Sequence, residues 1–345
     1  MSERAAPDLH GVIVIDKPRG PTSHDVVAQL RRALGTRGVG HAGTLDPMAS
    51  GVLVALVGEA TKLGPYLTAH DKHYEARVVF GLATATLDAE GDATDEQPVP
   101  TALREALQIL QVNPDGSSPD EAVLGWLTRI RAALDAERAR ALQIPPAYSA
   151  IKVQGEKSYA RARAGEQVEL EPRPVSVSSI RARAGSSHFD APSEPQPAPD
   201  GGQPVPLLDL TIEVSKGYYV RSLARDLGAA LGLPAHLAGL RRTASGPFAI
   251  ADAVRIDEGT ERLREALRPL ADVARAALPA AELHEMGAVR AGQGKRLTIE
   301  DFVVPPPGPE PSAWLDPSGK LVAVGEGVEG LFQVRRGFGA RERKE

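Results

Sequence analysis

The sequence has 345 residues, of which 42% are hydrophobic and 25% charged, and it contains no cysteine. This composition is typical of a globular protein with a sizeable core, and it excludes disulfides, thiolate zinc sites and a cysteine nucleophile. The formal net charge of −5 is low for a nucleic-acid-binding protein, but a local basic patch is enough to contact phosphate, so that class stays open. We find neither an apolar run of the roughly 18 residues that span a membrane nor a signal-peptide pattern, and we therefore expect a cytoplasmic protein without membrane contact.

The first predicted elements are a short strand and a capped helix. The β-branched residues at 12–15 (VIVI) predict the strand, and the Pro and Gly residues at 18–21 predict a turn after it. Thr22, with Asp25 three residues later, matches a capping box at a helix start. Apolar residues then recur at helical spacing as far as Gly35, which we expect to end the helix.

The next segment is rich in turn residues. Residues 38–51 (GVGHAGTLDPMASG) contain four glycines together with His41 and Asp46, and an apolar run at 52–57 (VLVALV) follows. We expect Asp46 to lie on a loop at the end of a buried strand, where a rigid element can present a side chain to a ligand. By itself, Asp46 could equally belong to an Asp-Pro turn or a helix N-cap.

The rest of the chain mixes strands with helices. Strands are predicted at 74–80, 175–182, 207–214 and from Leu240 onward. Residues 98–142 are predicted to be helical, and another helix is predicted after 215–219. Residues 81–95 and 186–206 are predicted to be loops. Short strands at 314–333 with Asp-Pro-Ser-Gly turns are typical of a small β-barrel. We therefore expect a mixed α/β domain at residues 1–278 and a small β-rich domain at 279–345.

Two other patterns in the chain are weak. Residues 38–43 match the dinucleotide-binding pattern G-x-G-x-x-G, but that motif follows a strand and opens a helix, whereas here it follows a basic helix and precedes Pro47. We therefore discount an NAD(P)-dependent oxidoreductase. His70, Asp71 and His73 have the spacing of no standard metal site, and we predict a solvated turn there instead.

Aromatic residues stand beside basic ones at two predicted strand edges or turns. Lys72 lies two residues before Tyr74, and Tyr219 lies two residues before Arg221, in a chain with only 4% aromatic residues. Rings that stack on bases, arginines that hold phosphate or carboxylate, and one carboxylate in a pocket suit chemistry on an unstacked nucleotide. Each tyrosine taken singly could equally be a core residue.

Several longer motifs resemble those of the bacterial tRNA pseudouridine synthase B (TruB) family. They lie at 16–23 (DKPRGPTS), 40–51 (GHAGTLDPMASG), 58–62 (GEATK), 71–74 (DKHY), 146–152 (PAYSAIK), 217–222 (GYYVRS), 226–228 (DLG) and 240–242 (LRR). They occur in the order of the family and span about residues 11–250.

The resemblance implies a pseudouridine synthase fold, in which a mixed, largely antiparallel sheet has a central cleft, with a PUA-like barrel at the C-terminus. It also implies the reaction, which converts the uridine in the T loop of tRNA, position 55 in the usual tRNA numbering, into pseudouridine. The family uses no cofactor and no metal. Its partner is the T-arm stem-loop of tRNA, and we expect no obligate protein partner.

The resemblance also assigns roles to residues. Asp46 matches the catalytic aspartate, Tyr74 the tyrosine that stacks on the flipped base, and Arg221 the arginine that pairs with the aspartate. The matches to residues that bind the substrate are His41, which helps to prise the uridine from the T loop, Tyr219 in the pocket, Leu240 beneath the base, and Lys17 and Lys152, which shape the cleft or contact phosphate.

Parts of the chain depart from the family pattern. The segments near 98–142 and 186–206 look like insertions, and residues 279–345 match only loosely, although Arg335, Arg336, Arg341, Arg343 and Lys344 give them a basic end. Two alternatives to a stand-alone synthase stay open. One is a tRNA-binding and refolding protein whose catalysis is secondary or lost, and the other is a synthase that depends on a guide RNA.

Overall fold

We describe the fold from a computed structural model, in residues 9–111, 119–149, 151–153, 156–158, 161, 170–183 and 206–339. Almost all of the loop predicted at 186–206, residues 112–118 of the stretch predicted to be helical, and the basic residues at 341–344 lie outside these ranges. Within them, no helix has the length and apolar character needed to cross a membrane.

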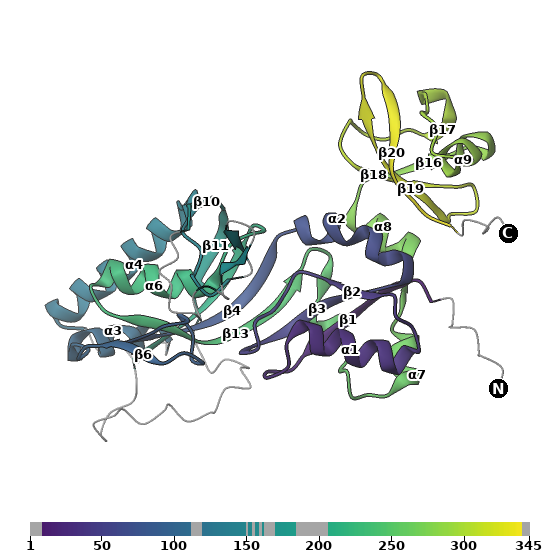
Figure 1. The fold of residues 1–345 in the computed structure, drawn as a ribbon. Coiled ribbons are helices and arrows are strands. Elements are labelled where there is room, and N and C mark those ends of the chain that lie inside the picture. Colours follow the sequence, from purple (N-terminus) through teal and green to yellow (C-terminus); the bar gives the residue numbers. More distant parts are fainter. Residues whose placement is uncertain are drawn as a thin grey trace.

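A mixed sheet of nine strands forms the centre of the described structure (Figure 1). Its main path runs through β11 (Val177–Ala182), β12 (Leu207–Val214), β4 (Lys72–Phe80), β13 (Ala235–Ser245), β3 (Ala49–Val57), β1 (Gly11–Lys17) and β15 (Arg268–Pro269), while β2 (Val39–Ala42) pairs with β3 and β14 (Phe248–Ala249) with β13. Only the β13–β3 pair is parallel among these pairings. The expected mixed, largely antiparallel sheet is therefore confirmed.

The two faces of this sheet enter different cores, as the alternation of side chains along a strand requires. Ile13 and Ile15 of β1 face one core, whereas Val12 and Val14 face the other. The first core is covered by α1 (Ser23–Leu34), α3 (Thr101–Gln111), α4 (Glu121–Arg138), α6 (Val220–Leu231) and α7 (Thr260–Glu265). The second is covered by the 3-10 helix η1 (Gly58–Leu63), α2 (Gly64–Ala69) and α8 (Leu270–Ala277).

A second sheet lies beyond α2 and α8 (Figure 1). Its order is β17 (Phe302–Val304), β16 (Ala280–Leu283), β18 (Ser312–Leu315), β19 (Leu321–Val328) and β20 (Leu331–Gly337), with α9 (Glu285–Gly292) and η3 (Ile299–Asp301) beside it. Leu321 and Val324 join the second core of the central sheet. Glu59 of η1 also accepts a hydrogen bond from the Gly339 amide at 2.8 Å. The division of the chain at residues 278 and 279 stays a prediction.

Three pairs of short antiparallel strands and one further 3-10 helix complete the described elements. They are β5 (Leu82–Thr84) with β6 (Ala93–Glu96), β7 (Leu142–Gln143) with β10 (Arg173–Pro174), β8 (Lys152–Val153) with β9 (Glu156–Lys157), and η2 (Ile250–Asp252). The prediction of a plain loop at 81–95 was therefore wrong. The hairpin was missed because β6 is exposed along its whole length and has no apolar alternation.

Other local predictions can be checked directly. The capping box of α1 is confirmed, since Thr22 Oγ1 accepts from the Asp25 amide at 3.1 Å and the Thr22 amide donates to Asp25 Oδ2 at 2.8 Å. Gly35 ends that helix in the left-handed conformation, with φ 69°. The prediction of a strand that starts at Leu240 was wrong, because β13 already begins at Ala235. Pairing with β4 extends it over residues that lack an apolar pattern.

Candidate active site

Asp46 lies on the loop between β2 and β3, where the sequence predicted it. Its side chain is 38% exposed, and its Oδ2 lies 2.9 Å from Nε of Arg221, whose side chain is only 7% exposed. Arg221 projects from the first turn of α6. An accessible carboxylate is thus paired with a buried guanidinium that comes from a distant part of the chain. Such an ion pair is strong when the remaining N–H donors of the guanidinium are also satisfied.

The loop that carries Asp46 is tied down by side chains from two earlier elements. Ser23 Oγ accepts from the Leu45 amide at 2.9 Å and donates to the Leu45 carbonyl at 3.1 Å. The ammonium group of Lys17 lies 2.8 Å from two carbonyl oxygens of the 18–21 turn and 3.5 Å from that of Pro47. The residues on both sides of Asp46 are therefore fixed, which limits how far its carboxylate can move.

Arg242 holds the same loop from the sheet. It is 1% exposed and donates from Nε to the Val52 carbonyl at 2.7 Å and from Nη2 to the Gly43 carbonyl at 3.0 Å. Gly51 makes this approach possible, because its φ is +99° and a Cβ there would lie 2.2 Å from the Arg242 carbonyl oxygen. Arg242 and Ser23 stood inside the quoted motifs, but nothing in the sequence assigned them this supporting role.

Two lysines of the quoted motifs are buried here. Burial lowers the pKa of Lys17 to about 8, although the nearby negative charge of Asp46 opposes the shift. Burial also lowers the pKa of Lys72 to about 8. Lys72 Nζ donates to the Thr68 carbonyl at 2.6 Å and to the carbonyl of His70. The ammonium groups of both lysines are thus directed at backbone oxygens, and for Lys17 this geometry favours shaping the site over contacting phosphate.

Register places two other expected residues, Leu240 and Tyr74, close to the strand that follows Asp46. Leu240 pairs with Ala49 on one side, three residues after Asp46, and with Ala76 on the other side, two residues after Tyr74. Because residues two apart in a strand point to the same face, Tyr74 lies on the face of Ala76, and it packs against the same core as Leu240. α6, which carries Arg221, covers this core as well.

His41 is also on this face, opposite Ala55 of β3. Its ring meets that of His24 edge to face, with 5.5 Å between centroids. Burial lowers its pKa, and the charges of His24 and Arg242 act in the same direction. Among the described atoms, its Nδ1 is buried without a hydrogen-bond partner, so this nitrogen is a polar group that a substrate could satisfy. Lys152 lies in β8, and its side chain is outside the described part.

Arg221 touches a second carboxylate that sequence reasoning missed. Its Nε lies 3.6 Å from Asp88 Oδ2, and its two other nitrogens donate to the carbonyls of Thr86 at 3.1 Å and Tyr148 at 2.9 Å. Asp88 is 4% exposed and follows β5 in the hairpin. Because the hairpin was predicted as a loop, no signal in the sequence placed Asp88 near Arg221.

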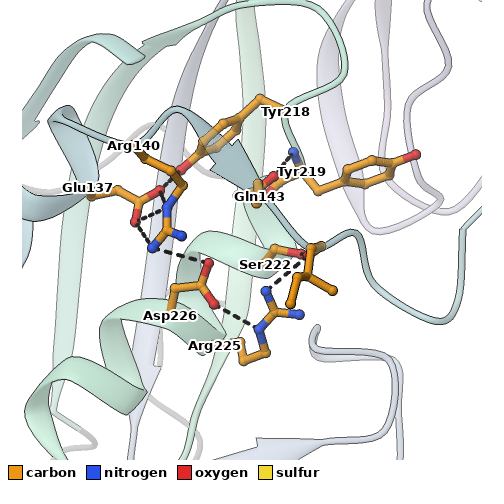
Figure 2. A network of polar contacts seen from close by, with 9 residues as sticks. Glu137, Arg140, Gln143, Tyr218, Tyr219, Ser222, Arg225 and Asp226 are labelled. Carbon is orange, nitrogen blue, oxygen red and sulfur yellow. Dashed lines mark hydrogen bonds and ion pairs between the residues drawn. The ribbon is translucent and has the colours of Figure 1, made fainter. Parts of the chain in front are cut away.

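Tyr219 is the residue just before α6 and is partly buried. Burial raises the pKa of its hydroxyl, and the negative charge of Asp46 adds to this, while Arg173 and Arg221 oppose it. Its main-chain amide and carbonyl are both bound by the side chain of Gln143 in β7 (Figure 2). His41, Tyr74 and Leu240 thus lie on the sheet face that the first core covers. Tyr219 and Arg221 lie at the start of α6, which packs on the same face, and Arg221 joins Asp46 to them.

Comparisons with known proteins identify the family of the chain. The model of the TruB family pseudouridylate synthase N-terminal domain matches residues 31–117 and 126–220, and that of the tRNA pseudouridylate synthase B C-terminal domain matches 221–273. The chain belongs to the TruB family. Its relatives include proteins named tRNA pseudouridine synthase B from Paenarthrobacter aurescens, 40% identical over 92% of this chain and 91% of the relative, and from Thermobifida fusca, 39% identical over 94% and 96%.

A solved structure has a similar fold at a lower identity. The match, to a chain of a Cbf5–Nop10–Gar1 complex, covers 96% of this chain and 86% of the other, with a TM-score of 0.66 and 22% sequence identity. At this identity the match concerns the fold alone. The dinucleotide alternative has no structural basis in this TruB family chain, because residues 39–42 form β2 and lead into another strand, not into a helix.

Proposed function

We propose that this TruB family chain is a tRNA pseudouridine synthase that isomerises the uridine of the T loop, position 55 in the usual tRNA numbering. The observation that carries the proposal is the 2.9 Å ion pair between Asp46 and the buried Arg221. The exposed part of the carboxylate can reach a nucleotide, while the guanidinium sets its direction and balances its charge.

The reaction leaves the composition of the nucleotide unchanged. The bond between N1 and C1′ breaks, the uracil turns, a bond forms between C5 and C1′, and the proton on C5 is replaced by one on N1. Asp46 begins this sequence either by attacking the nucleotide covalently or by removing a ribose proton to give a glycal. Both routes require an ionised carboxylate close to the sugar, which the pairing with Arg221 supports.

The residues around Asp46 suit a base that has left its stack. In the proposal, Tyr74 stacks on the uracil and helps to remove the C5 proton, Leu240 lies beneath the base, and Tyr219 closes the pocket. His41 takes the place of the contacts that the uridine loses in the T loop. Flipping a base costs a few kcal/mol, so contacts that replace its stacking and pairing partners contribute directly to the rate.

The remaining parts of the proposal concern the partner. We propose that the T-arm stem-loop of tRNA is the bound element and that the second sheet is a PUA-like domain that contacts RNA. Arg335 and Arg336 at its end are exposed, although Arg335 also pairs with Glu326. We further propose that the protein acts in the cytoplasm, without a cofactor and without an obligate protein partner.

The test measures tritium release from a T-arm RNA that carries 5-tritiated uridine, with wild type and Asp46→Asn. We expect release by wild type and only background release by Asp46→Asn, with both proteins binding RNA. Equal release by both proteins would exclude Asp46 as the catalytic residue. Release by neither, with tight RNA binding, would favour a binding protein or a synthase that needs a guide RNA.

A further inference from the structure

A single buried side chain holds the backbone from which two site residues project. Gln143 is 1% exposed, and its Oε1 accepts from the Tyr219 amide at 2.8 Å while its Nε2 donates to the Tyr219 carbonyl at 3.2 Å (Figure 2). A primary amide has one acceptor and one donor side, so it can replace both hydrogen bonds that a neighbouring strand would make. No charged or hydrophobic side chain can do the same.

This clamp acts at the end of α6 that has no side-chain cap. Tyr219 is the N-cap residue of α6, and no side chain caps the helix there. The backbone direction at Tyr219 sets both the direction of its own ring and the start of the turn that carries Arg221. The segment that follows Gln143 also binds the first turn of α6. The Ile144 carbonyl accepts from Ser222 Oγ at 3.0 Å, and the Tyr148 carbonyl accepts from Arg221 Nη2 at 2.9 Å.

A second set of contacts holds α6 independently of Gln143 (Figure 2). The buried carboxylate of Glu137 in α4 accepts from the Tyr218 hydroxyl at 2.6 Å and from Arg140 Nε at 2.7 Å. Arg140 also lies 3.3 Å from Asp226 of α6. These contacts anchor the helix without touching Tyr219 or Arg221 directly, so the loss of the Gln143 clamp should disturb the site while the helix stays docked.

We propose that Gln143 is a positioning residue for pseudouridine formation, which fixes Tyr219 and Arg221 relative to Asp46 through the Tyr219 backbone. The proposal rests on the proposed function. It also gives a role to the stretch of residues 98–142 that looks like an insertion, since α4 and β7 provide the frame for the N-terminal end of α6.

Two substitutions test the clamp, with a third as the control. Gln143→Leu removes both hydrogen bonds at similar volume, whereas Gln143→Glu keeps the acceptor but turns a second carboxylate oxygen toward the Tyr219 carbonyl when ionised. Glu137→Gln weakens the other anchor and contacts neither Tyr219 nor Arg221. The measurements are the single-turnover rate of pseudouridine formation in T-arm RNA at saturating enzyme, the Kd for that RNA, and the melting temperature.

We expect Gln143→Leu to lower the single-turnover rate about 10- to 100-fold, since a misplacement on the order of 1 Å can cost about 100-fold, with Kd changed less than about threefold. Glu137→Gln should lower the melting temperature at least as much and keep a rate within about threefold of wild type. The rate of Gln143→Glu, relative to wild type, should recover as the pH falls, because burial raises the pKa of a glutamate and its protonated form can restore both bonds.

The outcomes separate the two proposals. The positioning role is overturned, while the proposed function stands, if Gln143→Leu has the wild-type rate. The same holds if Gln143→Leu and Glu137→Gln lose rate in the same proportion to their loss of melting temperature. A ratio between Gln143→Glu and wild type that does not change with pH also counts against it. A wild-type protein that forms no pseudouridine in tRNA overturns the proposed function itself.

Discussion

Arg221 lies between the carboxylates of Asp46 and Asp88. Removing the charge of Asp88 tests whether this second carboxylate helps to position Arg221 against Asp46. In Asp88→Asn the side chain keeps an oxygen that can accept from Thr86 Oγ1 and the Glu90 amide, as Asp88 Oδ1 now does at 2.5 and 3.1 Å. The change therefore leaves the hairpin hydrogen bonds possible and removes the attraction to Arg221 across 3.6 Å. Arg221 would then be held by Asp46 and by backbone carbonyls alone.

The magnitude follows from this distance. Two charges 3.6 Å apart attract each other by about 5 kcal/mol at an effective dielectric constant of about 20. Desolvation offsets much of this attraction and Asp46 remains as a partner, so we expect the free energy of unfolding to fall by about 1–3 kcal/mol. Without Asp88, a shift of the guanidinium by roughly 1 Å from its present place, with Asp46 following it, should slow single-turnover pseudouridine formation about 10- to 100-fold.

The assay combines urea unfolding with single-turnover rates at saturating enzyme, so that a weaker affinity for RNA cannot lower the rate. Asp95→Asn is the matched control, because it makes the same chemical change at an exposed position of the same hairpin. We expect this control to behave as wild type. If Asp88→Asn has the stability and the rate of wild type, the second carboxylate does not hold Arg221 and the reasoning is refuted.

Two further predictions concern how the Asp46 loop is held. Gly51→Ala should destabilise the protein more than Gly20→Ala. Both glycines have φ near +100°, which costs an alanine about 1–2 kcal/mol, but only at Gly51 would the Cβ meet a backbone oxygen, at 2.2 Å, and such overpacking adds about 1–3 kcal/mol. Equal losses of unfolding free energy in urea would contradict the clash. For Lys17, burial lowers the pKa from 10.5 to about 8, so the unfolded chain binds more protons between these pH values and stability should rise with pH there. The free energy of unfolding of wild type, relative to that of Lys17→Met, should therefore increase as the pH rises from about 8 to about 10. A difference that stays constant over this range would refute the effect of burial.

Local sequence was sufficient wherever a structure depends on neighbours in the chain. The capping box of Thr22 and Asp25 and the left-handed Gly35 bracket α1 as predicted, because caps satisfy backbone groups within a few residues. The buried strand after Asp46 was predictable because a continuous apolar run can be buried on both faces. The motifs likewise identified the family, and they named Asp46, Tyr74 and Arg221 as the residues to examine.

The sequence by itself thus determined the local elements, the family and the identity of the candidate catalytic residues. Only the tertiary structure decided what holds those residues, because each support joins segments that are far apart in the chain. Asp88 reaches Arg221 through a hairpin without an apolar pattern, and Gln143 and Arg242 act on backbone groups of distant residues. A side chain can bind the backbone carbonyl of any residue and the amide of any residue except proline, so such contacts leave no signature in the sequence of the segment that is bound.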